Sequence, residues 1–386
     1  MAEPAGRTPR ILHCHSGFDL GGKEARAVRL MNHWGGRLRH TILSAMPDAM
    51  GARAMIDPSV PCTFPQDDPA SDAPSLQGLP APGRYWQWAR YMQQFDLVLS
   101  YNWGSMDAVM AHRMFSPWMR LPPLIHHEDG FNEDEAQARK PKRNHFRHLA
   151  LARAHALVVP SQILRGIAHG EWGQPEARIR AIPNGIDVDS YAYPAAPDAI
   201  PGFVRQPGKI VVGTLAGLRR VKNLARLVRV VAPLADRVQL VIVGEGPDRE
   251  AIAAQARASG VTDVHMPGFL AHPAHFMGLF DIFALSSDSE QFPISLVEAM
   301  AAGLPALSTD VGDVMAMVAE ENHAFVIPRD EESRMTGALA QLVDDAHLRR
   351  RVGAANQARA QRDFAETVMI ARYAALYGTA LKQGLD

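Results

Sequence analysis

The sequence is poor in cysteine, has almost no net charge and contains no long apolar run. Its 386 residues include two cysteines, Cys14 and Cys62, too few for a disulfide framework, so we expect a reducing, cytoplasmic compartment. The balance of 40 basic and 41 acidic residues argues against a nucleic-acid partner and an acidic disordered tail. No stretch of about 18 apolar residues is present to span a membrane, and the opening MAEPAGRTPR lacks a signal peptide's apolar segment. A globular protein of two or three domains remains.

Short apolar segments alternate with longer amphipathic segments along the chain. In 222–234, for example, Leu224, Leu227, Val228 and Val231 fall on one helical face. Buried strands that alternate with helices predict an α/β fold with parallel sheets and helices on both faces. We expect strands at 11–15, 41–45, 96–101, 123–127, 156–160, 209–215, 238–243, 263–267, 281–285 and 306–309. We expect helices at 22–33, 85–94, 137–153, 222–234, 249–259 and 293–302.

A segment rich in Pro, Ala and Gly divides the chain into two similar halves. It predicts a first Rossmann-like domain over 1–190, a linker over 191–207 and a second Rossmann-like domain over 208–362. One helix is expected from about 360 to near 381, and the stretch 57–83 reads as a long surface loop. Because ligands bind beyond the carboxyl ends of such strands, we expect the two sheets to face an interdomain cleft.

The strongest local pattern follows the predicted strand 281–285. Pro293 suits the first turn of a helix, which would leave the backbone N–H groups present in 291–295 free to bind an anion. Glu290 and Glu298 flank that position, and carboxylates beside a phosphate are expected to accept hydrogen bonds from hydroxyls. A sugar nucleotide offers a hexose and a ribose on either side of its diphosphate. The plainer alternative is that Glu290 caps the helix and Glu298 is a surface charge.

Two glycine-bearing loops follow other strands of the second half. The loop after 209–215 carries Arg219, Arg220 and Lys222, cations suited to a diphosphate leaving group, although a solvated basic loop has the same composition. It lacks the GxxxxGK[ST] pattern of a P-loop. The loop at Gly246 begins like a dinucleotide fingerprint, but Arg249 occupies the third glycine position. A nucleotide contact and a tight turn both remain open there.

In the first half, polar residues cluster after two predicted strands. Gly21 and Gly22 precede Lys23, and paired glycines let the backbone approach a phosphate or simply make a turn. His126, His127, Glu128 and Asp129 end the strand 123–127 and are acid–base or sugar-binding candidates. Adjacent strand residues point to opposite faces, so the two histidines are not expected to share a metal ion. His13 and His15 share a face, but their spacing matches no metal site, and we expect none.

Two further motifs have structural interpretations. Asp187 and Asp189 resemble an Asp-x-Asp metal–diphosphate motif, but they follow an Asn-Gly turn, and Asp187 reads as a cap of that loop. The stretch 139–153 concentrates cations beside Phe146, Leu149 and Leu151. It is either a solvated helix face or a peripheral contact with anionic lipid or an acidic acceptor.

Taken in order, these motifs resemble the retaining GT-B glycosyltransferases of family 4, also called glycosyl transferases group 1. The resemblance covers nearly the whole chain and is carried by GGKE, a strand-end histidine, IPNGID, VGTLAGLRRVKN, VGEGPDR, PGF and EQFPISLVEAMAAGLPALSTDVGDV. It implies two Rossmann-like domains and a C-terminal helix, 363–386, that packs back on the first domain. It also implies a metal-independent, retaining hexosyl transfer without a cofactor, from a UDP- or GDP-sugar to a saccharide or lipid-linked acceptor in the cell envelope.

The resemblance also assigns roles to residues. Glu290 would bind sugar hydroxyls, Lys222 would neutralise the diphosphate, and His126 would lie beside the transferring sugar. The implied donor contacts are Gly21, Gly22, Arg219, Arg220, Gly246, Phe269, Gln291, Phe292, Pro293, Ile294 and Glu298, with His127, Glu128 and Lys23 as further candidates.

One position departs from the family pattern. Five residues before Lys222, where an arginine is usual, stands Gly217, so Arg219 or Arg220 substitutes or Lys222 holds the diphosphate alone. Two other classes of protein therefore stay open. One is a sugar-nucleotide binder without catalysis, and the other is a different GT-B enzyme such as an epimerase or phosphorylase.

Overall fold

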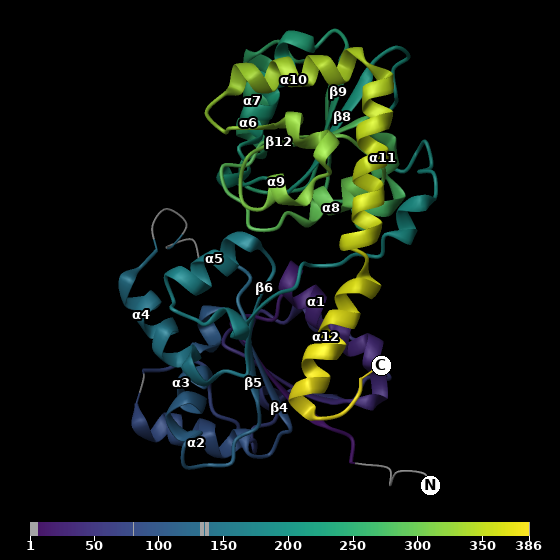
Figure 1. The fold of residues 1–386 in the computed structure, drawn as a ribbon. Helices are drawn as coiled ribbons and strands as arrows, with labels where there is room; N and C mark the ends of the chain where they lie inside the picture. Colours follow the sequence, from purple (N-terminus) through teal and green to yellow (C-terminus); the bar gives the residue numbers. More distant parts are fainter. Residues whose placement is uncertain (1–6, 80, 132–134, 136–138, 386) are drawn as a thin grey trace. The chain divides into compact units, whose positions relative to one another are not determined.

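The computed structural model describes residues 7–79, 81–131, 135 and 139–385. The chain divides into two compact units: the described residues up to Pro183 together with those from Ile370 onward, and residues Asn184–Met369. Each unit contains one parallel sheet with α-helices, as the sequence predicts (Figure 1).

In the first unit, seven strands within the described residues pair in the order β3-β2-β1-β4-β5-β6-β7. They are β1 (Arg10–His15), β2 (Arg39–Ser44), β3 (Cys62–Thr63), β4 (Leu97–Tyr101), β5 (Leu124–His127), β6 (Ala156–Val159) and β7 (Ile179–Ala181). The helices are α1 (Gly22–Trp34), α2 (Pro82–Met92), α3 (Met106–Phe115), α4 (Pro141–Ala150) and α5 (Gln162–Gly170). The stretch 57–83, predicted as a surface loop, contains the short edge strand β3. This strand pairs with His40 and Thr41 of β2.

Alternation along β1 sends its side chains to two different environments. Leu12 and Cys14 join a buried apolar cluster with α2, α3 and Trp172. His13 and His15 point to the opposite face of the sheet, as the period of two requires. The first face packs apolar side chains in a core cluster, and the second carries the buried rings of His13, His15 and Tyr101.

In the second unit, six described strands pair in the order β10-β9-β8-β11-β12-β13. They are β8 (Ile210–Leu215), β9 (Val238–Val243), β10 (Val264–Gly268), β11 (Ile282–Leu285), β12 (Ala306–Thr309) and β13 (Val326–Ile327). The helices are α6 (Leu224–Val231), α7 (Arg249–Ala258), α8 (Ile294–Ala301), α9 (Val314–Met317), α10 (Glu332–Asp344) and α11 (Ala346–Asp363).

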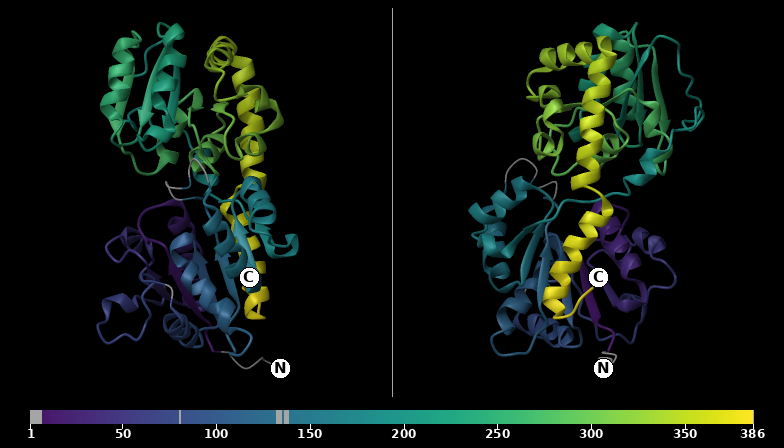
Figure 2. Two further views of the ribbon diagram at one scale, coloured as in Figure 1. Left: turned by 90° about the vertical axis from the view of Figure 1, so that its left-hand side faces the viewer. Right: turned by 45° about the vertical axis from the view of Figure 1, so that its right-hand side comes forward.

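Two apolar clusters cover the two faces of this second sheet. One contains side chains of α6, α7 and α10, and the other contains those of α8 and α9 with the end of α11. Figure 2 shows helices on both sides of the strands in this unit. Leu224, Leu227, Val228 and Val231, the stripe predicted from the sequence, are all buried in the first cluster. Because both ends of each connecting loop belong to these packed strands and helices, the loops at the carboxyl edge of the sheet are held in place.

The predicted linker 191–207 is wrong for this chain. The division between the units falls after Pro183, and the segment belongs to the second unit. Ile200 and Phe203 are buried in its core beside Phe276, which explains how a segment without helical or strand periodicity is nevertheless held in place. Its Pro and Gly content reflects an irregular path over the core.

The C-terminal segment contains a break that the sequence analysis misses. Instead of one helix from about 360, α11 ends at Asp363 and α12 (Glu366–Leu381) begins after Phe364 and Ala365. Phe364 is buried in the second unit's core, and Ala365 forms a bridge with Ile186. From Ile370 the helix belongs to the first unit, where it lies beside the central strands (Figure 1). The return predicted for residues 363–386 is therefore seen from Ile370 onward, while residues 363–369 belong to the second unit.

Candidate active site

Lys222 and Glu290 meet at the carboxyl edge of the second sheet. Lys222 follows β8 and Glu290 follows β11, and these strands are neighbours, so their loops lie side by side. Lys222 Nζ donates a hydrogen bond to Glu290 Oε1 at 2.6 Å, and Ser287 Oγ donates to the same oxygen at 2.7 Å. The pair brings a cation and a carboxylate together at the edge where ligands of such sheets bind.

The two loops are braced against each other. Asn223 adopts a left-handed conformation and caps α6, with its Oδ1 accepting from the Arg226 N–H at 3.3 Å. Arg226 donates to the Ser286 carbonyl at 2.8 Å and to Asp288 at 2.7 Å. Ser286 Oγ donates to the carbonyls of Lys222 and Asn223. These contacts hold the backbone on both sides of the Lys222–Glu290 pair.

The start of α8 follows the Glu290 loop directly. Pro293 occupies the N-cap position in an extended conformation, one residue before the expected first turn, and Ile294 begins the helix. Gly312 has a positive φ, and a Cβ there would lie 2.5 Å from the Glu290 carbonyl oxygen, so glycine lets the two loops pack. Among the described residues, the buried Gln291 Oε1 has no hydrogen-bond partner.

The remaining donor candidates of the second unit differ in their surroundings. Phe292 packs edge-on against Phe364, with ring centroids 5.6 Å apart, whereas Phe269 is 72% exposed. Glu298 is half-buried on α8. Gly246 has a φ of 156°, and a Cβ there would lie 2.4 Å from the Leu218 carbonyl oxygen, so the tight turn alone requires glycine.

Arg219 lies beside the glycine that departs from the family pattern. A Cβ built on Gly217 would lie 3.5 Å from Arg219 Nε and 3.9 Å from a terminal nitrogen of the same guanidinium. Both Arg219 and Arg220 are exposed at this edge of the sheet. The Arg219 head group therefore occupies space next to the position where the family carries its arginine.

In the first unit, Gly21 forms the N-cap position of α1 and Gly22 begins the helix. Lys23 donates to the Gly17 carbonyl at 2.9 Å and is paired with Glu24. The Glu24 carboxylate turns back so closely that a Cβ on Gly21 would lie 2.8 Å from its Oε2. Burial raises the pKa of Glu24, and the neighbouring Lys23 opposes that shift. Lys23 is thus engaged inside its own loop.

His126 and His127 point to opposite faces of the first sheet, as predicted. His126 Nδ1 lies 2.9 Å from Ser100 Oγ, and its Nε2 lies 3.7 Å from Glu128 Oε2. His127 Nε2 instead lies 3.0 Å from the Tyr377 hydroxyl on α12. Both imidazoles are fully buried. His126 is therefore the histidine that faces Glu128, while His127 joins the sheet to the returning helix.

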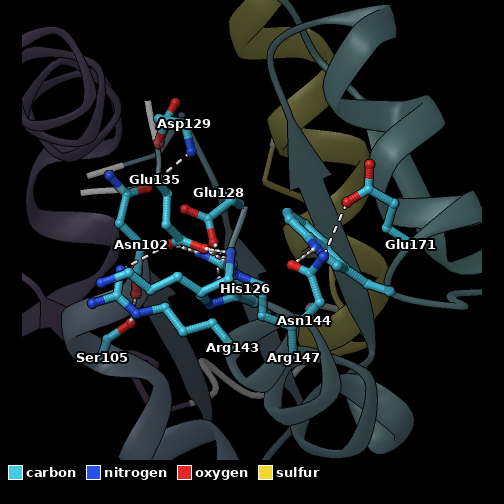
Figure 3. A network of polar contacts seen from close by, with 12 residues as sticks. Asn102, Ser105, His126, Glu128, Asp129, Glu135, Arg143, Asn144, Arg147 and Glu171 are labelled. Atoms are coloured by element: carbon cyan, nitrogen blue, oxygen red, sulfur yellow. Dashed lines mark hydrogen bonds and ion pairs between the residues drawn. The ribbon is translucent and has the colours of Figure 1, made fainter. Parts of the chain in front are cut away.

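A buried arginine, Arg147 of α4, completes the surroundings of His126 (Figure 3). It donates to Glu128 Oε2 at 3.3 Å and to both Glu135 oxygens at 3.2 Å. Burial acts to raise the pKa of Glu135, but hydrogen bonds from Arg147 and Arg143 outweigh burial and lower it. The guanidinium carbon also lies 5.0–5.5 Å from the ring centroids of Trp103, Phe131 and Trp172. The sequence placed Arg147 in the basic stretch, with no signal that it is buried.

The basic stretch 139–153 is only partly a surface patch. Helix α4 spans its centre, while residues 137 and 138 of the predicted helix 137–153 lie outside the described residues. Arg139 pairs with Glu171, and Arg143 pairs with Glu135 as Arg147 does. Leu149 is 44% exposed, and Lys142 and Arg153 are also exposed. Within the described residues, no helix combines the length and apolar character needed to cross a membrane.

Histidines and tyrosines fill the face of the first sheet opposite Arg147. His13 Nε2 lies 2.9 Å from His40 Nδ1, and its Nδ1 lies 3.2 Å from the Tyr101 hydroxyl. His15 stacks on Tyr101 with ring centroids 4.0 Å apart, and neither of its buried ring nitrogens has a partner among the described residues. Over the same described ranges, no group of three His, Cys, Asp or Glu residues has the arrangement of a metal site.

These buried histidines predict acid sensitivity of the fold. Burial lowers the pKa of His40 to about 4 and, with repulsion from neighbouring groups, holds those of His13, His15 and His127 well below 6.5. The unfolded chain therefore binds protons below about pH 6.5 that the folded chain does not, so stability falls as the pH falls through this range. Each histidine removes up to about 1.4 kcal/mol per pH unit.

Urea unfolding at pH 7.5 and 5.5 tests this expectation. The midpoint should be clearly lower at pH 5.5. His40→Gln should reduce the difference between the two midpoints, whereas substitution of the exposed His33 by Gln should leave it unchanged. Equal pH dependence in all three proteins would contradict the role of the buried histidines.

Two family models match the chain. "Glycosyltransferase Family 4" matches residues 20–190, and "Glycosyl transferases group 1" matches residues 198–359. EpsF of Bacillus subtilis (strain 168) is 33% identical over 171 residues, which cover 43% of this chain and 44% of EpsF. The N-acetyl-alpha-D-glucosaminyl L-malate synthase of Bacillus anthracis is 21% identical over 278 residues, which cover 71% of this chain and 72% of the synthase. The chain thus spans less than half the length of EpsF and more than two thirds of the synthase.

Solved structures agree on the fold. HepE of Anabaena in complex with UDP superposes with a TM-score of 0.79 at 20% identity, over 96% of this chain and 100% of HepE. The lipopolysaccharide outer core galactosyltransferase WaaB superposes with a TM-score of 0.69 at 15% identity, over 96% of this chain and 99% of WaaB. Because the two family models together extend over most of the sequence and the fold agrees, the chain belongs to the GT-B glycosyltransferases of group 1, family 4.

Proposed function

We propose that the protein transfers a hexosyl unit from a nucleotide-diphosphate sugar to an acceptor hydroxyl, with retention at the anomeric carbon. The observation that carries this proposal is the Lys222–Glu290 contact at the carboxyl edge of the second sheet, directly before α8. A lysine and a carboxylate side by side suit a ligand that presents phosphate oxygens next to sugar hydroxyls.

The chemical step needs charge stabilisation at the leaving diphosphate. The bond from the anomeric carbon to the β-phosphate oxygen breaks, and the acceptor oxygen forms a bond to the same carbon from the same side. A phosphate oxygen takes the acceptor proton. In this proposal Lys222 and the N–H groups before α8 stabilise the growing negative charge, so that neither a metal ion nor a carboxylate nucleophile is required.

Both ends of the donor have binding partners in this proposal. Glu290 accepts hydrogen bonds from the hexose hydroxyls, and Glu298 accepts them from the ribose. Gly21 and Gly22 are proposed to offer backbone N–H groups to the diphosphate. His126 contacts the transferring sugar, and since its ring is fully buried in this structure, that contact requires the ring to become exposed when substrate binds.

Arg219 is proposed to replace the arginine missing at position 217. Its guanidinium lies next to Gly217, which supports a working diphosphate site over a binder that has lost catalysis. We expect Arg219→Ala to weaken donor binding about tenfold, equivalent to about 1.4 kcal/mol, a typical loss for a charge-assisted hydrogen bond. Calorimetric titration of the donor measures this loss.

Arg220 supplies the matched control, because it is the adjacent exposed cation in the same turn. Arg220→Ala should change donor affinity by less than threefold. Equal losses in the two variants would indicate a general effect of charge, and no loss in Arg219→Ala would leave Lys222 as the principal cation.

The acceptor is proposed to be a saccharide or lipid-linked saccharide of the cell envelope. WaaB, named for the lipopolysaccharide outer core, supports this class of acceptor. We further propose that the enzyme works in the cytoplasm at the inner face of the membrane. The proposed membrane contact uses the exposed members of the basic stretch, Lys142, Leu149 and Arg153.

Incubation with UDP-, GDP- and ADP-sugars, with and without EDTA, tests the proposal. We expect one donor to release its nucleotide, unaffected by EDTA, and NMR to find the product anomer unchanged in configuration. Release that requires inorganic phosphate would identify a phosphorylase, and inversion would contradict the mechanism. Binding of donors without turnover toward any acceptor would favour a non-catalytic binder.

A further inference from the structure

Glu290 is bonded to the same lysine that the diphosphate needs. Lys222 Nζ lies 2.6 Å from Glu290 Oε1, and the two side chains are only 20% and 11% exposed. Ser287 Oγ donates to the same carboxylate oxygen at 2.7 Å. The backbone on both sides is held by Asn223, Ser286 and Arg226. The ion pair is therefore a supported, partly buried contact, unlike an exposed surface pair of long side chains.

A phosphate that binds Lys222 competes with Glu290 for the same ammonium group. Glu290 then shares or loses its charged donor and lies beside the negative charge of the phosphate, and both changes oppose binding where solvent is partly excluded. A nucleoside diphosphate ends in a phosphate there and has no sugar hydroxyl to donate a hydrogen bond to the Glu290 carboxylate. An intact nucleotide sugar does, because its hydroxyls can replace the hydrogen bond that Lys222 gives up.

We propose that Glu290 acts as an internal counter-ion that competes with the diphosphate for Lys222, and so favours the intact donor over the nucleoside diphosphate product. This inference rests on the proposed function, since it takes Lys222 and Glu290 as the diphosphate and sugar partners. It adds a second role for Glu290. After transfer, the carboxylate returns to Lys222 and helps to displace the product.

Glu290→Gln separates the two roles. The amide has nearly the same size and still accepts a hydrogen bond, but it carries no charge to compete for Lys222. We expect the dissociation constant of UDP, or of GDP if the site takes guanine, to fall at least tenfold. That of UDP-glucose or GDP-mannose should stay unchanged or rise, because the sugar loses its charged acceptor. The ratio of the two constants should therefore shift at least tenfold toward the nucleoside diphosphate.

Isothermal titration of the full chain with UDP, UDP-glucose, GDP and GDP-mannose provides the test. Glu332→Gln is the charge control, because Glu332 pairs with Arg229 through both oxygens at 2.8 Å and does not contact Lys222. It should leave all four constants unchanged. Glu290→Asp, which keeps the charge but retracts it, should tighten nucleoside diphosphate binding less than Glu290→Gln does. Its result decides the question if the Gln variant does not fold.

The outcomes distinguish this inference from the proposed function. If the wild-type protein binds nucleotides but neither substitution of Glu290 tightens UDP or GDP binding, the counter-ion role is wrong and the proposed function stands. If Glu332→Gln produces the same gain, the effect is a general one of net charge and the inference is overturned. If the wild-type protein binds none of the four compounds and releases nucleotide from none of the UDP-, GDP- and ADP-sugars, the proposed function fails and the inference fails with it.

Discussion

Lys222→Ala should lower kcat/KM for the nucleotide-sugar donor by about 100- to 1000-fold, the loss seen when one preorganised stabiliser of a transition-state charge is removed. The lysine is held at the edge of the second sheet by the neighbouring loop contacts, so its position at the diphosphate costs little rearrangement beyond release of Glu290. Because charge on the diphosphate grows as the glycosidic bond breaks, most of the loss should appear in kcat. Initial rates of nucleotide release across donor concentrations measure the effect.

Arg229→Ala is the charge control for this experiment. Arg229 is an exposed cation of α6, the helix that follows Lys222, and it pairs with Glu332 outside the candidate site. It should retain activity within threefold of wild type. A loss confined to KM in Lys222→Ala would show that the lysine binds the donor without stabilising the transition state, and unchanged kinetics would contradict its proposed role.

Arg147→Met should destabilise the protein by about 3–5 kcal/mol, the cost of removing one partner from a buried ion pair. The substitution keeps an unbranched side chain among the three aromatic rings, but it leaves Glu128 without its arginine partner and Glu135 with Arg143 alone. The Glu135 pKa, lowered by its arginine partners despite burial, should rise in the variant. Urea unfolding monitored by circular dichroism measures the loss of stability.

Arg143→Met provides the comparison, because Arg143 pairs with the same glutamate but is 20% exposed. Its loss should cost about 1 kcal/mol or less. Adding Glu128→Gln and Glu135→Gln to Arg147→Met should recover part of the stability, since the uncompensated charges are then gone. Equal destabilisation by Arg143→Met and Arg147→Met would contradict the view that burial makes Arg147 special.

The parts of the fold that depend on apolar burial were predictable from the sequence. The strand Val238–Val243 was predicted at its observed bounds because every residue in it is buried. The edge strand β13 was missed because Val326–Ile327 is too short to show a period. The break at Phe364–Ala365 was missed for another reason: it arises from contacts with the second unit's core and with Ile186, which lies far away in the sequence.

In the candidate site, too, some features were predictable from the sequence and others depend on contacts between distant segments. Motif order predicted Lys222 and Glu290 as partners of one ligand, but the sequence could not show that they form a hydrogen bond with each other. That contact depends on β8 and β11 being neighbours, a property of sheet order. Likewise, strand alternation predicted that His126 and His127 point to opposite faces of the sheet. Only the structure shows that His126 faces Glu128 and that His127 contacts Tyr377. The burial of Arg147 had no signal in its basic surroundings.

A crystal structure of the full chain with the nucleotide sugar that it turns over tests the central claim most directly. The account predicts that the diphosphate lies against Lys222 and the N–H groups before α8, that sugar hydroxyls replace Lys222 at Glu290, and that the ribose contacts Glu298. A nucleotide bound elsewhere in the molecule, or bound here with the Lys222–Glu290 hydrogen bond intact, would contradict it.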